Sequence, residues 1–298
     1  MILVVGLSAV WQRSMFFDGF HPSEVNRAKR VLETASGKGV NVARVLTTLG
    51  VGARVLTVAG GGRGELFCRA LKADGVSARV VTVAGETRMC QTVIGGGVVT
   101  ELVEESPALR KTEVKAVERA FAEELGRAKM LVLSGTVPVG CGDDFCRRLA
   151  RLARQRRMPV VVDTQRAQLM GAVRERPTLV KINRAELAAA TGEGGVGELV
   201  KLGAERVVIS HGAKAVVAFD GRERWKVQPP RVQAVNPIGS GDSMLAGIVV
   251  GLWRGWGLKE AVQLGVACGA ANVLTETSGV VHMTDVRRLL RELRNKQK

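Results

Sequence analysis

The chain has 298 residues, 46% of them hydrophobic, and a formal net charge of +16. This length and composition allow a full hydrophobic core and argue against a disordered chain. The longest apolar runs, 1–10 and 246–253, are shorter than the ~20 residues that cross a membrane. The first residues are typical of a β-strand and not of a secretory signal, so we expect a cytoplasmic protein without membrane contact.

Five cysteines, none in a CxxC pair, indicate reduced thiols and neither a disulfide framework nor a zinc site. The positive charge favours anionic partners, although much of it is arginine on apparent helix faces at 145–157 and 285–298. We expect no nucleic-acid binding, because aromatic residues are 4% of the chain and tyrosine is absent. A phosphorylated small molecule fits the charge better.

Along most of the chain, short β-branched runs alternate with helical patterns. The expected strands lie at 2–6, 53–60, 78–83, 130–135, 159–164, 178–183, 206–210 and 215–220. The expected helices lie at 39–50, 63–75, 112–128, 143–157, 184–192 and 196–204. Apolar strands separated by helices predict an α/β fold, with a doubly wound, mostly parallel sheet flanked by helices.

Two stretches, 9–35 and 86–105, break this alternation with strand-like segments that no crossover helix separates. Such strands do not fit a parallel core, so we place them in a small antiparallel β lid. Its edge strands need a partner, and a lid over the active site that also joins a homodimer would provide one. Residues 1–298 then form a single domain that includes this lid.

The sequence NPIGSGDSMLAG places Gly239, Ser240 and Gly241 directly before Asp242 and a helical pattern. Free N–H groups and the dipole make a helix N-terminus an anion site, and small residues let a phosphate approach. Asp242 would stand beside that anion as a base, although an ordinary turn and helix cap have the same pattern. The chain has no GxxxxGK[ST] loop, and we expect the glycine-rich stretches 60–65 and 192–198 to be loops without phosphate.

Two weaker motifs accompany this one. In SGKGVN, Gly37 and Gly39 flank Lys38 at a helix start, and Asn41 lies in the first turn, within reach of a ligand hydroxyl. In NRAE, Asn183 and Glu186 lie three residues apart, just after a strand. Ligands bind at the carboxyl ends of such strands, where Glu186 could hold a water of Mg²⁺.

Together these motifs resemble the PfkB carbohydrate kinases of the ribokinase-like fold, over essentially the whole chain. The order GKGVN, LSGTVP, VVVDT, KINRAE, VVISHGAKA, NPIGSGDSMLAG and GVACGAANVLTETSGV is similar to that of the family. EVNRA, GKGVNVARVL and GDSMLAG look most like its 1-phosphofructokinase and tagatose-6-phosphate kinase branch. The resemblance implies an ATP- and Mg²⁺-dependent kinase of a sugar or sugar phosphate, such as fructose 1-phosphate or tagatose 6-phosphate.

The resemblance also implies roles for individual residues. It makes Asp242 the base that takes the proton of the acceptor hydroxyl, and forms the anion hole from Gly239, Ser240 and Gly241. It assigns Mg²⁺, through water, to Asn183 and Glu186. It places around the nucleotide Ser210, Gly212, Asn272 and Gly279. It assigns to the acceptor Gln12, Gly37, Lys38, Gly39, Asn41 and Arg88, with Arg27 as a second arginine for a substrate phosphate.

The sequence departs from the family mostly on the acceptor side. Gln12 stands where the branch usually has an aspartate that binds sugar hydroxyls, and Ser36 and Cys90 replace a common glycine and asparagine. Ile182 replaces a common proline beside the NxxE motif. Two alternatives therefore stay open: a kinase of an unphosphorylated sugar or nucleoside, and a ligand-binding pseudokinase.

Overall fold

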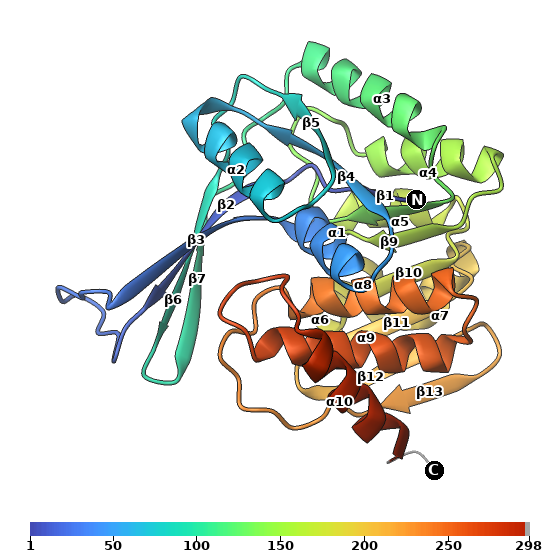
Figure 1. Ribbon diagram of the computed structural model, residues 1–298. Helices are drawn as coiled ribbons and strands as arrows, with labels where there is room; N and C mark the ends of the chain where they lie inside the picture. Colours follow the sequence, from blue (N-terminus) through green and yellow to red (C-terminus); the bar gives the residue numbers. More distant parts are fainter. Residues whose placement is uncertain (296–298) are drawn as a thin grey trace.

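The computed structural model describes residues 1–295, which form a large sheet, a small sheet and their helices (Figure 1). The large sheet has nine strands in the order β13-β12-β11-β10-β9-β8-β1-β4-β5. Seven of these pair in parallel: β1 (Ile2–Val5), β4 (Ala53–Ala59), β5 (Ala78–Thr82), β8 (Met130–Ser134), β9 (Val160–Asp163), β10 (Leu179–Asn183) and β11 (Val207–His211). At one edge, β12 (Lys214–Phe219) and β13 (Arg224–Val227) continue the sheet in antiparallel pairing.

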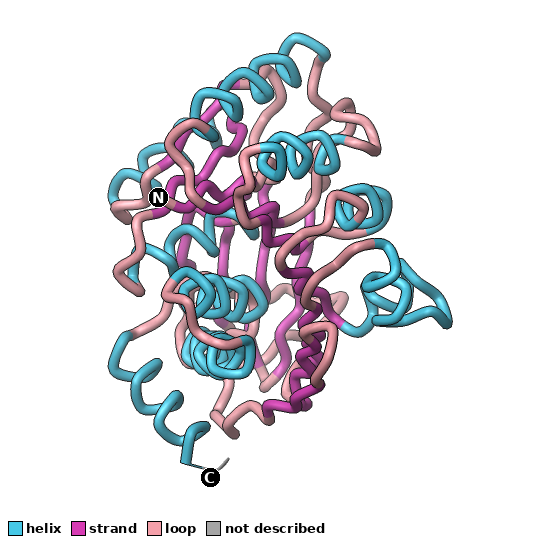
Figure 2. The backbone as a smooth tube through the Cα atoms, turned by 90° about the vertical axis from the view of Figure 1, so that its right-hand side faces the viewer, coloured by secondary structure: helices cyan, strands magenta, loops and turns pink. Residues whose placement is uncertain are grey.

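Helices cover both faces of the large sheet (Figure 2). One core lies under α1 (Lys38–Thr48), α2 (Gly61–Ala73), α8 (Ser240–Trp253), α9 (Leu258–Val273) and α10 (Met283–Asn295). The other lies under α3 (Lys111–Leu125), α4 (Phe145–Gln155), α5 (Arg166–Val173), α6 (Arg184–Thr191) and α7 (Gly195–Leu202). Strand β1 is apolar throughout because its side chains pack in both cores. Ile2 and Val4 lie in the first core, and Leu3 and Val5 lie in the second. The predicted fold class is confirmed.

The small sheet, which we call the lid, projects from the body of the molecule (Figure 1, left). Its order is β3 (Arg30–Ser36), β2 (Val10–Phe16), β6 (Met89–Gly95) and β7 (Val98–Val103). The outer pairs are antiparallel, as expected, while β2 and β6 in the middle pair in parallel. The strands come from the two stretches that break the helix and strand alternation, and the chain between Phe16 and Arg30 forms an irregular connection.

Some local expectations were wrong. The glycine-rich stretch 60–65 begins α2, and 192–198 forms a 3₁₀ turn (Gly192–Gly194) and the start of α7, so neither is a plain loop. The sequence also gave no expectation of β13, α5 and α9. Four cysteines are buried, Cys68 is exposed, and all five are free thiols. Among the helices of residues 1–295, none has the length and apolar character that a membrane span requires.

Candidate active site

Twelve of the seventeen predicted site residues line one cavity of about 440 Å³, which we call the Asp242 cavity. It lies where the carboxyl ends of β9, β10 and β11 meet the first turn of α8 under the inner face of the lid. The twelve are Gln12, Gly37, Lys38, Asn41, Arg88, Asn183, Glu186, Ser210, Gly239, Ser240, Gly241 and Asp242. Segments far apart in the sequence therefore converge at one edge of the sheet, where open α/β sheets bind ligands.

Asp242 is the buried acid of this cavity. It lies in the first turn of α8 and is 7% exposed. Its Oδ2 accepts a 2.8 Å hydrogen bond from Nδ2 of Asn41. Burial raises the pKa of Asp242 from 3.8 to about 6, although Lys38 and the hydrogen bond from Asn41 oppose the rise. A carboxyl with this pKa is ionised at neutral pH yet basic enough to accept a proton from a hydroxyl.

Asn41 is held in one orientation by its own partners. Its Oδ1 accepts from Oγ of Ser36 at 3.1 Å and from Nη1 of Arg44 at 3.3 Å. These two bonds orient the amide so that its nitrogen, Nδ2, faces the carboxylate of Asp242. We expected Asn41 to reach a ligand hydroxyl, whereas the structure shows its nitrogen on Asp242 and thereby links α1 to α8.

The run of small residues before Asp242 has two different explanations. Gly239 has a φ of 82°, and a Cβ there would lie 2.6 Å from the backbone nitrogen of Gly279. At Gly241 the φ is ordinary, but a Cβ would lie 3.1 Å from Nζ of Lys181. Gly239 is therefore required by the turn, while Gly241 leaves room beside an ammonium group. An anion at this helix start would meet backbone N–H groups and a cation together.

Two lysines share the carboxylate of Asp163, the last residue of β9. Lys181 Nζ lies 2.9 Å from Oδ2, and Lys38 Nζ lies 3.5 Å from Oδ1. Burial of Asp163 opposes its ionisation, but the two lysines hold its pKa below the usual value. Asp163 in turn is the main cause that raises the pKa of Lys38. The Lys38 ammonium group therefore stays charged at the cavity wall.

The NxxE residues form a capping box at the start of α6. The backbone N–H of Glu186 donates to Asn183 Oδ1 at 2.9 Å, and that of Asn183 donates to Glu186 Oε2 at 3.0 Å. The remaining oxygen, Glu186 Oε1, lies 3.6 Å from Nζ of Lys38. Residues 1–295 contain no group of three or more His, Cys, Asp or Glu side chains that could hold a metal ion. Hard oxygen donors are present, so the site fits a Mg²⁺ that keeps most of its waters.

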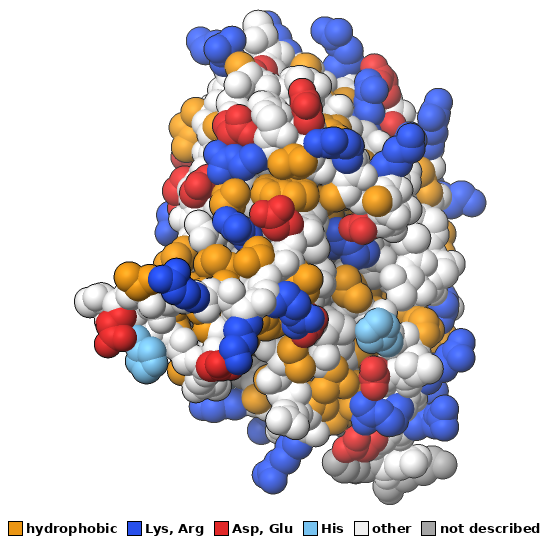
Figure 3. Space-filling view, turned by 60° about the vertical axis from the view of Figure 1, so that its left-hand side comes forward, with side chains coloured by type: hydrophobic (Ala, Val, Ile, Leu, Met, Phe, Trp, Pro, Cys, Tyr) orange, Lys and Arg blue, Asp and Glu red, His pale blue; other side chains and the backbone are white. Residues whose placement is uncertain are grey.

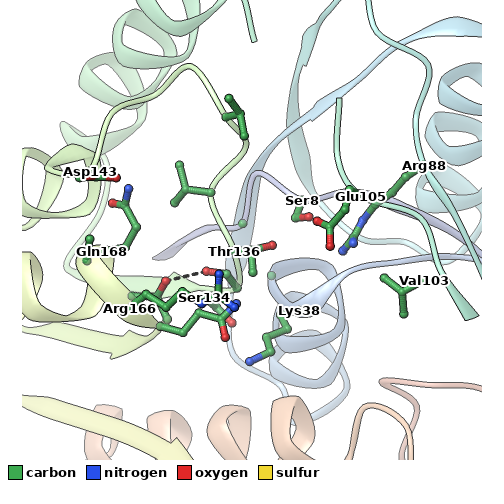
Figure 4. Close-up of a pocket in the computed structure, with 18 residues that line it drawn as sticks. Ser8, Lys38, Arg88, Val103, Glu105, Ser134, Thr136, Asp143, Arg166 and Gln168 are labelled. Carbon is green, nitrogen blue, oxygen red and sulfur yellow. Dashed lines mark hydrogen bonds between the residues drawn. The ribbon is translucent and has the colours of Figure 1, made fainter. Parts of the chain in front are cut away.

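A second cavity of about 520 Å³, the Arg166 cavity, adjoins the first (Figure 4). The two share Lys38, Arg88 and Val103 as lining residues, and Gly39 lines only the second. Figure 4 shows Lys38 and Arg88 reaching into this space from separate sides, with Arg166 of α5 on the side opposite Arg88. Arg88 donates from Nη1 to the carbonyl oxygen of Glu104 at 3.0 Å, while its buried Nε has no hydrogen-bond partner within residues 1–295.

Four predicted residues do not line either cavity. Arg27 is exposed in the loop between β2 and β3. Gly212 has a φ of 54° in the tight turn between β11 and β12. Asn272 is fully buried: its Oδ1 accepts from Ser243 and Gly279, and its Nδ2 donates to the carbonyl oxygen of Ile238. A Cβ on Gly279 would lie 2.6 Å from that of Asn41. Asn272 and Gly279 thus support the turn before Asp242.

The sequence reading missed three charged residues of the Asp242 site: Asp163, Lys181 and Glu101. Lys181 and Glu101 line the cavity, and Asp163 anchors Lys181. A signal for two of them was present, because Asp163 ends an otherwise apolar strand and Lys181 stands between the apolar residues Val180 and Ile182. Charged side chains in a fully buried strand need a partner and occur mainly where one is supplied.

The sequence matches the pfkB family of carbohydrate kinases over residues 1–283. The chain belongs to this family. The members of this family are carbohydrate kinases, and the chain is therefore a carbohydrate kinase. The order of the motifs in the sequence predicts the same activity.

Solved structures of the same fold cover nearly all of the chain. Phosphofructokinase-2 from Escherichia coli, in complex with substrates and products, has a TM-score of 0.89 and 27% identity, covering 98% of this chain and 99% of that one. A carbohydrate kinase from Agrobacterium tumefaciens has a TM-score of 0.75 and 26% identity, covering 98% and 97%. A Thermotoga maritima protein named as a possible 1-phosphofructokinase has a TM-score of 0.87, covering 98% and 97%, but its 23% identity supports the fold alone.

Proposed function

We propose that this kinase transfers the terminal phosphoryl group of ATP to a hydroxyl of a phosphorylated ketohexose, of the fructose 1-phosphate or tagatose 6-phosphate type. The observation that carries the proposal is the geometry around Asp242. A buried carboxylate with a pKa of about 6 lies in the first turn of α8, three residues after the glycine at its N-cap, in a cavity with two ammonium groups. Phosphoryl transfer depends mainly on such positioning and on neutralisation of charge.

In the proposed reaction, Asp242 accepts the proton of the acceptor hydroxyl as that oxygen bonds to the terminal phosphorus. The bond from this phosphorus to the bridging oxygen of ATP breaks, and ADP leaves with that oxygen. The N–H groups at the start of α8 and Nζ of Lys181 would stabilise the charge on the transferring group. Asn41 keeps the carboxylate turned toward the cavity through its 2.8 Å hydrogen bond.

We assign Mg²⁺ to Glu186, through water, with Asn183 fixing the orientation of that carboxylate. The position of Glu186 supports this assignment, because the residue lines the cavity and the capping box uses only its Oε2. When bound, the metal would neutralise the phosphate charge of the nucleotide. We assign Ser210 to the nucleotide, since it lies at the end of β11 on the same cavity wall.

The phosphorylated acceptor is inferred from the cations between the two cavities. Lys38 and Arg88 line both, and the unpartnered Nε of Arg88 can bind an anion. An unphosphorylated sugar or nucleoside would offer no anionic group to the guanidinium of Arg88. The E. coli enzyme, which is similar in fold, has been solved with fructose 6-phosphate, and this sugar phosphate belongs in any acceptor screen.

An ADP-release screen of sugars, sugar phosphates and nucleosides tests the proposal. We expect turnover with a phosphorylated ketohexose, and the Arg88→Ala variant should raise KM for it by about 10- to 100-fold, because a charged hydrogen bond is lost. An unchanged KM, or turnover with neutral acceptors only, would favour the kinase of an unphosphorylated acceptor. Binding of ATP and sugar without any turnover would favour a pseudokinase.

We also propose that the lid joins two copies of the chain. Its edge strands β3 and β7 have unpaired sides, and apolar side chains lie exposed on it, at Val31 (37%), Val98 (63%) and Leu102 (52%) (Figure 3). Exposed strand edges and apolar patches of this kind usually acquire a partner. Sedimentation analysis should show a dimer that Leu102→Glu converts to monomers; a monomeric wild type would refute the contact.

A further inference from the structure

Three carboxylates line the Asp242 cavity, and one of them has no role in the proposed reaction. Asp242 bonds to Asn41, and Glu186 is held by its capping box. The third, Glu101, comes from β7 of the lid. Among the described residues it forms no hydrogen bond or ion pair, although Arg88 is near enough to lower its pKa. Burial outweighs this effect and raises the pKa of Glu101 above the usual value.

Strand alternation explains why Glu101 faces the cavity. Glu101 and Val103 both line the cavity and Leu102 between them does not, although all three side chains are partly open to solvent. In the register of the lid, Glu101 pairs with Thr92, and Val103 pairs with Cys90, which in turn pairs with Gln12. The inner face of the lid therefore presents a short row of polar groups above the site, with Glu101 at one side.

Glu101 is the charged hydrogen-bond acceptor on the lid side of the cavity, because Gln12 and Cys90, its polar neighbours there, are neutral. Gln12 is buried and donates from Nε2 to Oγ1 of Thr92 at 2.8 Å, so part of its hydrogen-bonding capacity is already used. Cys90 is a buried thiol whose pKa is raised by burial, and it stays neutral. A carboxylate on a cavity wall that has no donor gains most from O–H groups of a ligand.

We propose that Glu101 is a specificity-determining residue that accepts hydrogen bonds from free hydroxyl groups of the acceptor sugar. The inference rests on the proposed kinase function and deepens it. Arg88 and Lys38 bind the anionic group of the acceptor, while Glu101 repels that group and binds hydroxyls. The acceptor is thereby held in one orientation, with a hydroxyl beside Asp242. A site built on hydroxyl hydrogen bonds discriminates strongly against analogues that lack one.

The test compares Glu101→Gln and Glu101→Ala with the wild type, at saturating ATP, on fructose 1-phosphate, fructose 6-phosphate, tagatose 6-phosphate and single-deoxy analogues of the best acceptor. Glu33→Gln is the matched control, because Glu33 is a lid carboxylate that pairs with Arg13 and lines neither cavity. We expect both Glu101 variants to raise the acceptor KM by about tenfold or more, with kcat, the KM for ATP and thermal stability nearly unchanged. Glu33→Gln should behave as the wild type.

The deoxy analogues separate a direct contact from a structural effect. If Glu101 accepts a hydrogen bond from one hydroxyl of the acceptor, the analogue that lacks this hydroxyl should bind the wild type more weakly than the parent sugar does. Glu101→Ala should bind that analogue and the parent sugar equally well, so the two changes are non-additive. An unchanged acceptor KM in both variants, or equal penalties for every analogue in wild type and variants, would overturn the inference. Wild-type turnover in the same assay keeps this outcome distinct from failure of the proposed function, in which no acceptor is phosphorylated at all.

Discussion

Asn41 donates a 2.8 Å hydrogen bond to Asp242 across 201 positions of sequence. The bond joins the first turn of α1 to the first turn of α8, and Ser36 and Arg44 fix the amide that makes it. Both helix starts reach the carboxyl edge of the large sheet, so the pair also defines the centre of the Asp242 cavity.

Replacing Asp242 should separate activity from stability. We expect Asp242→Asn to lower kcat by about 10²- to 10⁴-fold, the range for loss of a general base, while ATP binding measured by calorimetry is retained. The folded pKa of about 6 lies above 3.8, so ionisation of this buried carboxyl costs about 3 kcal/mol. This cost is absent below about pH 4 and complete above about pH 6.

Asp242→Asn should therefore unfold at a higher temperature than the wild type at pH 8 and at a similar temperature at pH 4. Thermal melts at the two pH values measure the difference. Equal melting temperatures at pH 8, or a less stable variant, would show that the carboxylate is not under a desolvation penalty.

The pH profile of kcat/KM should report the same carboxyl. Activity of the wild type should fall as pH drops through about 6, because protonated Asp242 is no base. Lys38 lowers the pKa of Asp242, so Lys38→Met should move this acid limb to higher pH. Lys38→Arg keeps the positive charge and should leave the limb near its wild-type position. A limb that moves to lower pH in Lys38→Met would contradict the assignment.

The pair of Asp163 and Lys181 makes a prediction about stability. Lys181→Met leaves the fully buried Asp163 with only the longer contact to Lys38, and should destabilise the fold by up to about 3–5 kcal/mol. The double variant Asp163→Asn/Lys181→Met removes the unpaired charge and should recover much of this loss, but not the activity. Urea unfolding and initial rates check the two parts. A double variant no more stable than Lys181→Met would refute the ion-pair account.

Two glycines with positive φ form a matched pair. A Cβ on Gly279 would lie 2.6 Å from that of Asn41, whereas nothing lies within 4 Å of one on Gly212. Alanine should add similar backbone strain at both sites, about 1 kcal/mol. Only Gly279→Ala should displace Asn41 and lower kcat by about tenfold or more. Comparable kcat values in the two variants would show that Asn41 tolerates the displacement.

The sequence predicted elements better than contacts. The alternation of apolar strands and helices was sufficient for the parallel sheet, and the absence of crossover helices located the lid. These local patterns do not predict which helix N-termini lie next to each other in the fold. Asn272 looked like a residue beside the nucleotide, yet both ends of its amide are used to support the turn before Asp242.

The charged residues show the same limit. Asp163 and Lys181 are 18 positions apart on neighbouring strands, and their pairing follows only from the strand order. Arg27 looked like Arg88 as a possible phosphate ligand, but the length of the loop between β2 and β3 places it on the surface. Glu101 gave no signal in the sequence, because its orientation depends on the register of β7 against β6.

The central claim is that Asp242 serves phosphoryl transfer to a phosphorylated ketohexose. The most direct measurement follows a radiolabelled γ-phosphate from ATP onto fructose 1-phosphate, fructose 6-phosphate and tagatose 6-phosphate, with wild type and Asp242→Asn side by side. We predict a labelled bisphosphate from at least one acceptor, made by the wild type and lost in the variant. Equal labelling by both proteins, or no labelled sugar with the wild type, would contradict the account.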